Sequence, residues 1–229
     1  MKIAGMNVEY VDHMGTDLSV ANAARVSFEK ESEWDETTAI KSGISITVSR
    51  SLKPGDVKLI SYLAKHNHWS PFAHTSVTFR VKAPIFVARQ LVKHTIGFSW
   101  NEVSRRYVDS EPEFFIPEVW RKRADNVKQG SSDVPVNGVG WDTEDAVEKM
   151  LNHYKHLLDS GVCPEQARMI LPQNTMTEWI WTGSVYAFAR MCNLRLDSHT
   201  QAETREIAKM ISDEMISLYP ISWKVLVYA

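Results

Sequence analysis

The segment from Gln90 to Tyr107 constrains this chain most, because an ordinary core segment does not gather so many groups able to hold anions and planar rings. Basic side chains stand there beside neutral hydrogen-bonding ones, and Glu102 is the only acid. The basic members are Lys93, His94, Arg105 and Arg106, and the neutral ones are Gln90, Asn101, Ser104 and Tyr107. This mixture predicts a nucleotide-binding site.

The local pattern gives this segment a predicted order of elements. Proline is favoured at the first helical position and glycine just after the last, so we expect a helix from Pro84 that ends at Gly97. Three polar side chains, spaced three and four residues apart, then share one helical stripe. They are Gln90, Lys93 and His94. A loop over residues 99–104 and a short strand over 105–108 should follow, and loops between rigid elements commonly carry binding groups.

Length and charge exclude several classes of protein. A chain of 229 residues, 44% of them hydrophobic, can bury a sizeable core, and no linker divides it, so we expect one domain over residues 1–229. The net charge of −2 provides no strong field toward nucleic acids or anionic membranes. No apolar run reaches membrane-spanning length and the first ten residues lack a signal-peptide core, so we expect a cytoplasmic protein.

The cysteines and histidines do not predict a metal site. Cys163 precedes Pro164 at an expected helix start and Cys192 lies among apolar residues, so both are interpreted as structural. Two groups of histidines have spacings that could suit a metal, but no carboxylate pair accompanies them. These groups are His66, His68 and His74, and His153 with His156.

Periodicity along the chain predicts an α+β fold with a central, mostly antiparallel, twisted sheet flanked by helices and a helix-rich C-terminal half. Strands are expected over residues 2–11, 75–82, 113–117 and 174–181. Helices are expected over 18–27, 56–67, 142–158, 164–172, 182–193 and 196–218, with Pro220 after the last one and a docked apolar tail over 223–228. The polar run 29–36 should be a solvated loop and residues 120–141 a mobile excursion.

The central segment also resembles the signature of the flavin-dependent thymidylate synthases, which is Arg-His-Arg, seven or eight residues, then Ser. Here it reads Lys93-His94-Thr95, eight residues and Ser104, so two of the first three positions differ. Residues 101–107 are similar to the family's Asn-Glu-x-Ser-x-Arg-Tyr. Further similar blocks lie at residues 66–74, 82–90, 167–172 and 193–203, so the resemblance covers nearly the whole chain.

The resemblance implies an activity and its co-substrates. Family members methylate deoxyuridine monophosphate (dUMP) to thymidine monophosphate (dTMP). Methylenetetrahydrofolate gives the carbon, and FAD reduced by NADPH gives the hydride. Family members assemble as homotetramers with each site built from several subunits.

The resemblance also implies which residues hold the nucleotide. Arg195 matches the arginine that favours ionisation of uracil, and a cation at the ring would stabilise the charge that develops as N3 loses its proton. Arg106 and Arg168 can bind phosphate through bidentate hydrogen bonds, which a lysine cannot reproduce. Ser104 has no identifiable base beside it, so we expect a hydrogen bond rather than nucleophilic attack. The complete dUMP set is Gln90, Lys93, Glu102, Ser104, Arg105, Arg106, Arg168 and Arg195.

A second implied set holds FAD. It comprises His68, Ser70, Lys93, His94, Thr95, Glu102, Ser184, Tyr186 and Arg190. Several members depart from the family pattern, and Ala73 replaces a common glutamate. Arg190, in place of an amide, could restore the phosphate charge lost at Thr95.

Several residues keep a second interpretation. His68 could be a turn histidine bonded to backbone, and Arg168 could be a surface ion-pair residue. Ser27 could approach the flavin or simply end a helix, and residues 126–131 could be a family loop near the site or a solvated turn. For the whole chain, the alternatives are a catalytically impaired flavin- or nucleotide-binding relative, a nucleic-acid-binding protein and a purely structural helical protein.

Overall fold

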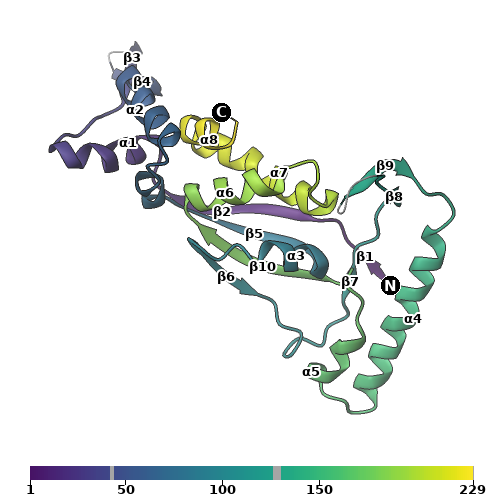
Figure 1. Cartoon of the computed structure of the whole chain (residues 1–229). Coiled ribbons are helices and arrows are strands. Elements are labelled where there is room, and N and C mark those ends of the chain that lie inside the picture. The colour runs from purple at the N-terminus through teal and green to yellow at the C-terminus, as the bar shows by residue number, and fades with distance from the viewer. Residues whose placement is uncertain (42–43, 126–129, 229) are drawn as a thin grey trace.

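The computed structural model describes residues 1–41, 44–125 and 130–228, and at its centre is a four-stranded antiparallel sheet (Figure 1). In their order across the sheet the strands are β2 (Asn7–Met14), β5 (Ser76–Pro84), β10 (Met176–Gly183) and β6 (Phe98–Glu102). β10 pairs with β5 from one end to the other and with β6 on its other side. β6, which lies within the polar segment 90–107, is therefore an edge strand.

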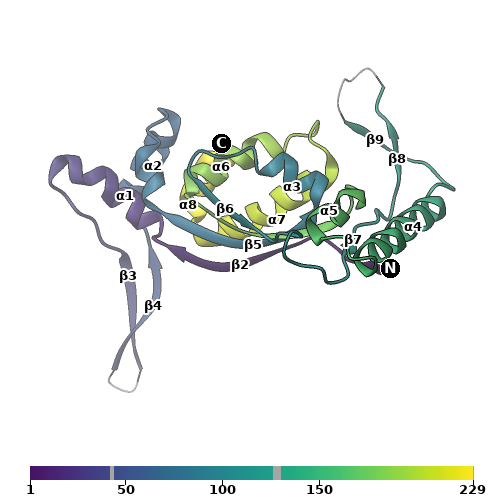
Figure 2. The ribbon, with the colours of Figure 1, turned by 90° about the horizontal axis from the view of Figure 1, so that it is seen from below.

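One face of this sheet is covered by helices. In β5 the side chains of Val77, Phe79 and Val81 are fully buried, whereas those between them are partly or fully exposed, which confirms the predicted alternation. Figure 2 shows the helices gathered on that side of the strands. They are α3 (Ile85–Leu91), α6 (Val185–Arg195), α7 (Ala202–Leu218) and α8 (Pro220–Val227). Their apolar side chains form the largest core cluster with the strands.

The opposite face of the sheet carries polar pairs. Arg80 on β5 forms an ion pair with Glu178 on β10 at 2.8 Å, and the hydroxyls of Thr78 and Thr182 are 2.9 Å apart. The sheet is thus apolar on its helix-covered side and polar on the other, as expected for an antiparallel sheet with one solvated face. The predicted α+β class with an antiparallel sheet is confirmed.

The N-terminal helices and a hairpin project from one end of the sheet (Figures 1 and 2). The elements are α1 (Asp17–Arg25), the short 3-10 helix η1 (Val26–Phe28), β3 (Asp35–Lys41), β4 (Ile44–Ser51), α2 (Pro54–Lys65) and the 3-10 helix η2 (Ser70–His74). The helix expected from residue 56 begins earlier, with Lys53 as the N-cap of α2 and Asp56 in its first turn. The buried Asp56 carboxylate instead accepts from Arg25 at 2.6 Å and from the Ser32 hydroxyl at 2.6 Å.

Asp17 joins the two ends of the chain. Its side chain is buried, and its two carboxylate oxygens accept hydrogen bonds from the backbone N–H groups of Ile221 and Ser222, at 2.8 and 2.9 Å. These amides belong to the first turn of α8, where backbone N–H groups lack helical partners and favour a negative charge. The apolar tail predicted over 223–228 is therefore docked as part of a helix.

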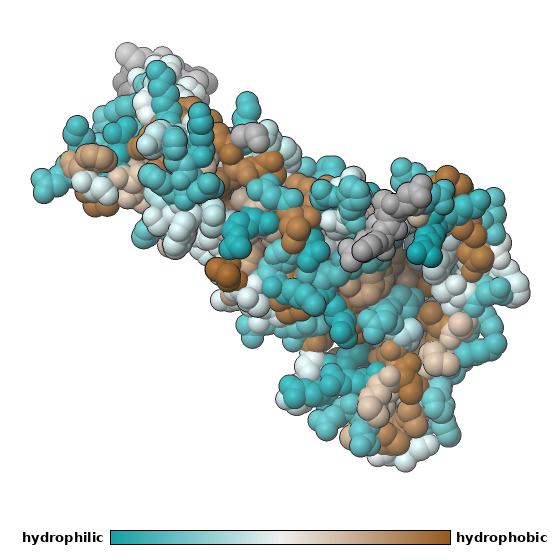
Figure 3. Space-filling view, in the orientation of Figure 1, coloured by the Kyte–Doolittle hydropathy of each residue, from teal (hydrophilic) through white to brown (hydrophobic). Residues whose placement is uncertain are grey.

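The other end of the molecule holds a smaller helical region. Its elements are β1 (Lys2–Ile3) paired parallel to β7 (Glu113–Phe114), the hairpin β8 (Arg121–Arg123) and β9 (Ser131–Pro135), α4 (Gly140–Asp159), α5 (Pro164–Ala167) and η3 (Arg168–Ile170). Phe114, Val147, Leu151 and Tyr154 are buried together here. In Figure 3 apolar surface gathers over α4 and α5. Met150 of α4 and Met169 of η3 are exposed.

Four local predictions were wrong. Residues 98–102 form a strand rather than a loop, since Trp100 pairs with Trp181 and stacks on Trp179 at 4.3 Å between ring centroids. Residues 105–108 form no strand and lie in the turn that follows. The strand β3 begins within the expected loop 29–36, and strands β8 and β9 lie within the expected excursion 120–141. Residues 126–129 lie outside the described residues.

The last long helix also starts later than predicted. Residues 196–201 form a turn, in which the Asp197 carboxylate accepts from the backbone N–H of His199 at 2.7 Å and the Thr200 hydroxyl donates to the Leu194 carbonyl at 3.0 Å. Side chains that bond nearby backbone compete with helix formation. α7 ends before Pro220 as predicted, and Pro220 then starts α8.

Candidate active site

The turn after α3 carries the signature residues. Pro84 is the N-cap of α3, so the predicted helix start is confirmed, but the helix ends at Leu91 and not at Gly97. Lys93 and His94 thus follow the helix and do not share a stripe with Gln90. Gly97 has a φ of 80° in the connection to β6, and a Cβ there would approach the Ala187 side chain to 3.0 Å. This tight connection holds the turn against α6.

Arg195 lies at the C-terminal end of α6 and binds this turn. Its Nε donates to Nε2 of His94 at 3.0 Å, and its Nη2 donates to the backbone carbonyl of Gln90 at 2.8 Å. The C-terminal end of a helix favours a cation, and burial lowers the pKa of Arg195 only from its very high ordinary value. The guanidinium is therefore charged and held by two acceptors.

His94 is neutral in this arrangement. Burial, then the nearby charges of Arg195 and Arg190, lower the pKa of His94 to about 4. A guanidinium can only donate, so Nε2 of His94 must be the unprotonated acceptor nitrogen. The ring proton of the neutral imidazole then lies on Nδ1.

A pocket of about 830 Å³ lies beside this pair. Gln90, Lys93 and Arg195 line it, so the structure brings together three of the predicted nucleotide ligands. The Gln90 amide donates to Gln201 at 2.7 Å, which orients it at the pocket wall. Polar side chains from α3, the α3–β6 turn and the α6–α7 turn thus share one cavity. We refer to it as the Arg195 pocket.

A second pocket, of about 630 Å³, collects another part of the predicted set. Glu102, Arg105 and Arg168 line it, and it shares no lining residue with the Arg195 pocket. Glu102 accepts from Trp100 at 3.1 Å and from Thr177 at 2.7 Å, which fixes its carboxylate at the edge of β6. We refer to this cavity as the Arg168 pocket. Within one chain, Arg168 and Arg195 therefore line different cavities.

Arg168 is loosely held. It begins η3, its side chain is exposed, and its Nε donates to the Glu165 carbonyl at 3.3 Å. No ion pair to Arg168 occurs among the described residues, so the surface ion-pair interpretation receives no support there. The side chain of Arg105 makes a shorter hydrogen bond than that of Arg168, because its Nη1 donates to the Ser110 carbonyl at 2.8 Å.

Ser104 and Arg106 interact with one another. The Ser104 hydroxyl accepts from the Arg106 backbone at 3.4 Å and from its Nε at 3.2 Å. The Arg106 guanidinium also lies over the Tyr107 ring, 5.0 Å from its centroid. No basic side-chain acceptor is bonded to Ser104 in the described part of the chain, so its contacts suit a hydrogen-bonding role and give no sign of an activated nucleophile.

Most of the predicted flavin ligands lie on α6 or on segments that contact it, whereas Glu102 lines the Arg168 pocket. Ser184 is the N-cap of α6 and accepts from the Ala187 amide at 3.2 Å, and Tyr186 lies next to Trp69, 6.0 Å between ring centroids. His68 and Ser70, the sequence neighbours of Trp69, are exposed. The backbone N–H of His68 donates to the Leu63 carbonyl. Arg190, Lys93 and Thr95 are exposed toward the other end, where Arg190 acts on His94.

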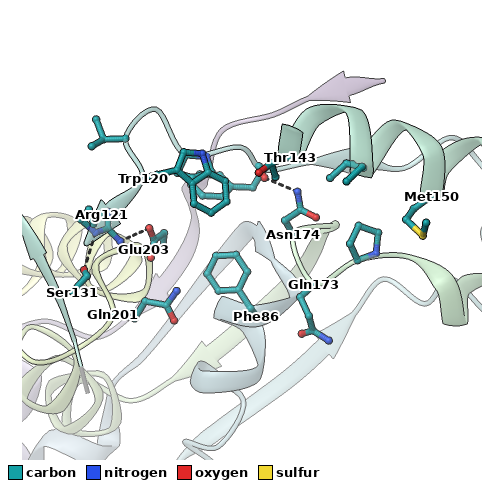
Figure 4. Close-up of a pocket in the computed structure, with 16 residues that line it drawn as sticks. Phe86, Trp120, Arg121, Ser131, Thr143, Met150, Gln173, Asn174, Gln201 and Glu203 are labelled. Carbon is teal, nitrogen blue, oxygen red and sulfur yellow. Dashed lines mark hydrogen bonds and ion pairs between the residues drawn. The ribbon is translucent and has the colours of Figure 1, made fainter. Parts of the chain in front are cut away.

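Sequence reasoning missed an apolar pocket of about 540 Å³ that adjoins the Arg195 pocket (Figure 4). Phe86, Trp120 and Met150 line it, and at one side Arg121 binds Glu203 at 2.5 Å. Arg121 and Gln201 line both cavities. Glu203 stood in a motif block without a role, and Arg121 stood in a segment expected to be mobile, so only the tertiary structure connects them.

The two cysteines differ in their exposure. Cys163 is the exposed N-cap of α5, and Cys192 is buried, where burial raises the pKa of its thiol. Within residues 1–41, 44–125 and 130–228, no three His, Cys, Asp or Glu side chains gather as a metal site. None of the helices in the described part of the chain combines the length and apolar composition needed to cross a bilayer.

Comparison with known proteins identifies the class. Residues 9–221 match the family model described as thymidylate synthase complementing protein, and this match spans most of the chain. The chain therefore belongs to that family of enzymes, which confirms the resemblance seen in its sequence motifs.

Individual relatives are similar over more than four fifths of their length. The flavin-dependent thymidylate synthase of Thermosipho africanus is 38% identical over 207 residues, which cover 89% of this chain and 82% of the relative. That of Kosmotoga olearia is 37% identical over 221 residues, 95% and 88% of the two chains. Among solved structures, the UMP/dUMP methylase PolB from Streptomyces cacaoi bound with 5-Br UMP has a TM-score of 0.80 at 28% identity, covering 98% of this chain and 95% of that one.

Proposed function

We propose that this protein methylates dUMP to dTMP, with methylenetetrahydrofolate as carbon donor, NADPH as reductant and FAD as cofactor. The observation that carries the proposal is the guanidinium of Arg195, which two acceptors fix beside a polar pocket of about 830 Å³. Membership of a family whose relatives are named flavin-dependent thymidylate synthases supports the same reaction. Residues 1–229 act as one domain in this proposal, and the water-soluble substrates favour a cytoplasmic location.

Arg195 is the proposed catalytic residue. The hydrogen bonds to His94 and to the Gln90 carbonyl occupy one edge of its guanidinium and leave other N–H groups available for a ligand. A uracil ring placed against them would lose its N3 proton more easily, because the guanidinium stabilises the negative charge that develops. That charge raises electron density at C5, where the new carbon–carbon bond forms.

The remaining nucleotide ligands divide by chemistry. The Gln90 amide and the Glu102 carboxylate would orient the base through hydrogen bonds, and Lys93 would add positive charge beside Gln90. Ser104, Arg105 and Arg106 would contact the phosphate or sugar, with Arg168 as the phosphate fork. The exposed position of Arg168 and the lack of a described ion pair suit an anion that arrives with the ligand.

The residues proposed for FAD fit a dinucleotide. Lys93 and Arg190 are exposed and form no ion pair with any described residue, so they can meet an anionic diphosphate. Thr95, His94 and the Ser184 hydroxyl can form hydrogen bonds, while His68, Ser70, Glu102 and Tyr186 complete the set. When bound, FAD reduced by NADPH would supply the hydride that completes the methyl group.

The two pockets suggest a site shared between subunits. Arg168 and Arg195 line cavities without a common residue, yet the proposed reaction needs both on one nucleotide. We infer that the Arg168 pocket of one copy meets the Arg195 pocket of another in a homotetramer. A closed assembly of identical chains can complete every site in this way.

A mixing experiment tests this assembly. Arg195→Ala and Arg168→Ala proteins should each be poorly active alone at low dUMP. After equal amounts are dissociated and reassembled together, sites that combine the intact Arg195 of one chain with the intact Arg168 of another should restore roughly a quarter of wild-type activity by random assortment. No restoration in demonstrably mixed oligomers would place both arginines in the same subunit and contradict the shared site.

The activity itself is tested with purified protein and FAD. We expect a yellow protein that forms dTMP from dUMP and methylenetetrahydrofolate only when NADPH is present. UMP should be run beside dUMP, because the structural relative is described as a UMP/dUMP methylase. The second candidate is a catalytically impaired flavin- and nucleotide-binding relative, and the observation behind it is the exposed Thr95 in place of a charged signature residue. Tight binding of FAD and dUMP without dTMP formation would favour this candidate.

A further inference from the structure

The contact between His94 and Arg195 supports a role beyond cofactor binding. We propose that His94 is a positioning residue whose neutral imidazole fixes the plane of the Arg195 guanidinium toward the substrate base. This inference rests on the proposed function, since it assigns His94 to the nucleotide half of the site. It also separates His94 from its signature neighbours Lys93 and Thr95, whose exposed side chains have no described contact with Arg195.

The geometry fixes the guanidinium from one short turn. The His94 backbone N–H donates to the Leu91 carbonyl at 3.0 Å, so the turn after α3 is itself held by a hydrogen bond. From this turn the ring nitrogen of His94 accepts from Nε of Arg195, while the last turn of α3 offers the Gln90 carbonyl to Nη2. Two acceptors on two different nitrogens define the orientation of a planar group, which one contact would leave free to rotate.

The electrostatics keep the imidazole in the state that this contact needs. The charges acting on the His94 ring are those of Arg195 and Arg190, both on α6, and with burial they hold the pKa of His94 near 4. A protonated ring would set two cations against each other and would have no lone pair at Nε2. Nε2 of His94 can therefore accept the hydrogen bond from Arg195 throughout the neutral pH range. Because the ring is uncharged there, it needs no carboxylate partner.

Two amide substitutions separate positioning from mere loss of the ring. In His94→Gln the side-chain oxygen is as many bonds from Cα as Nε2 is in histidine, so it can accept from Arg195. In His94→Asn the oxygen is one bond shorter and reaches only the Nδ1 position. We expect His94→Gln to retain kcat within about threefold, and His94→Asn to lose roughly tenfold or more, the scale of one hydrogen bond to a charged group. The KM for dUMP should change less than kcat.

The same pair controls for a cofactor role. If His94 acts only on FAD, the two amides should weaken FAD binding, and the loss of activity should disappear at saturating FAD. We expect equal FAD dissociation constants for the two variants within about threefold, measured by flavin fluorescence. A difference in kcat that persists at saturating FAD supports positioning, and its disappearance overturns it.

Coupling to Arg195 provides the decisive measurement. In an Arg195→Ala protein the His94→Asn substitution should cause no further loss of kcat, because the group that it positions is gone. Equal losses in both backgrounds would overturn the inference. Wild-type protein measured in the same series keeps the two hypotheses apart: if it forms no dTMP the proposed function fails, whereas an active wild type with equivalent Asn and Gln variants refutes only the role of His94.

Stability against pH gives a readout that does not require turnover. Because the pKa of folded His94 lies near 4 and below its ordinary value of 6.5, the unfolded chain binds more protons between these values. The stability that comes from keeping the His94 ring neutral is fully present above pH 6.5. The free energy of unfolding then falls as pH falls toward 4. His94→Gln should flatten that part of the stability profile relative to wild type, and an unchanged profile would show that the ring is not held neutral by burial and the charges of Arg195 and Arg190.

Discussion

The Arg195 and Arg168 pockets hold their arginines in opposite ways. Arg195 is partly buried and bonded at 3.0 and 2.8 Å to two acceptors, whereas Arg168 is exposed with one bond of 3.3 Å to a backbone carbonyl. A group that stabilises a developing charge works best when its orientation is fixed beforehand, but a phosphate ligand can be completed by the incoming anion. The contrast supports the proposal that Arg195 serves the reaction and Arg168 serves binding.

The largest effect should come from the preorganised side. Arg195→Ala removes the charge beside the base, so we expect kcat for dTMP formation to fall by roughly 10²–10³-fold, as for other fixed electrostatic groups. Rapid-quench measurement of dTMP at saturating dUMP checks this. Arg195→Lys should remain far below wild type, because an ammonium cannot keep both acceptors. A variant that raises only KM would reverse the assignment of the two arginines.

The second effect should appear in binding. Arg168→Ala should raise the KM for dUMP by about 10–100-fold, the cost of about 1.5–3 kcal/mol for a lost charge-assisted contact, while kcat at saturation stays near wild type. Arg168→Lys should recover part of the affinity. The measurement is a dUMP titration of initial rates beside calorimetric binding of dUMP, and a drop in kcat with unchanged affinity would contradict it.

A smaller effect is expected at Ser104. The hydroxyl accepts only from Arg106 in the described structure, so Ser104→Ala should lower kcat/KM by about two- to tenfold, the scale of one neutral hydrogen bond. Initial rates at low dUMP measure this loss. A Ser104→Ala protein that folds and binds dUMP but has no turnover would show that the serine is part of the chemistry.

The smallest effect should be that of Arg190. Its exposed charge is screened by solvent, so Arg190→Ala should weaken FAD binding by only a few-fold, and more clearly at low salt. Arg190→Lys keeps the charge and is the matched control. Fluorescence titration with FAD measures the change, and an unchanged affinity would remove Arg190 from the proposed flavin set.

The sequence predicted the strongly patterned parts of the fold. The alternation around Val77, Phe79 and Val81 identified β5, and prolines located the start of α3 and the end of α7, whereas Gly97 did not mark the end of α3. It failed at Trp100, whose strand depends on stacking against Trp179 across the sheet. Such pairing joins residues far apart in the chain, so local patterns carry no trace of it.

The site was predictable as a list of residues but not as an arrangement. Motif similarity named both Arg168 and Arg195, yet nothing in their spacing could reveal that one chain places them in separate cavities. The bond from Arg195 to His94 joins positions 101 residues apart, and the Arg121–Glu203 pair spans 82. The first contact joins the end of α6 to the turn after α3, and the second joins α7 to the β8–β9 hairpin.

The Asp17 carboxylate has a consequence for how the chain opens. Because it bonds the amides of Ile221 and Ser222, the first helix and the last one share a pair of hydrogen bonds. Those two amides should therefore exchange with deuterated solvent at rates set by the joint opening of both ends, not by fraying of the C-terminus alone. Replacing Asp17 with asparagine would expose α8 to exchange while leaving the slow amides of β5 and β10 protected.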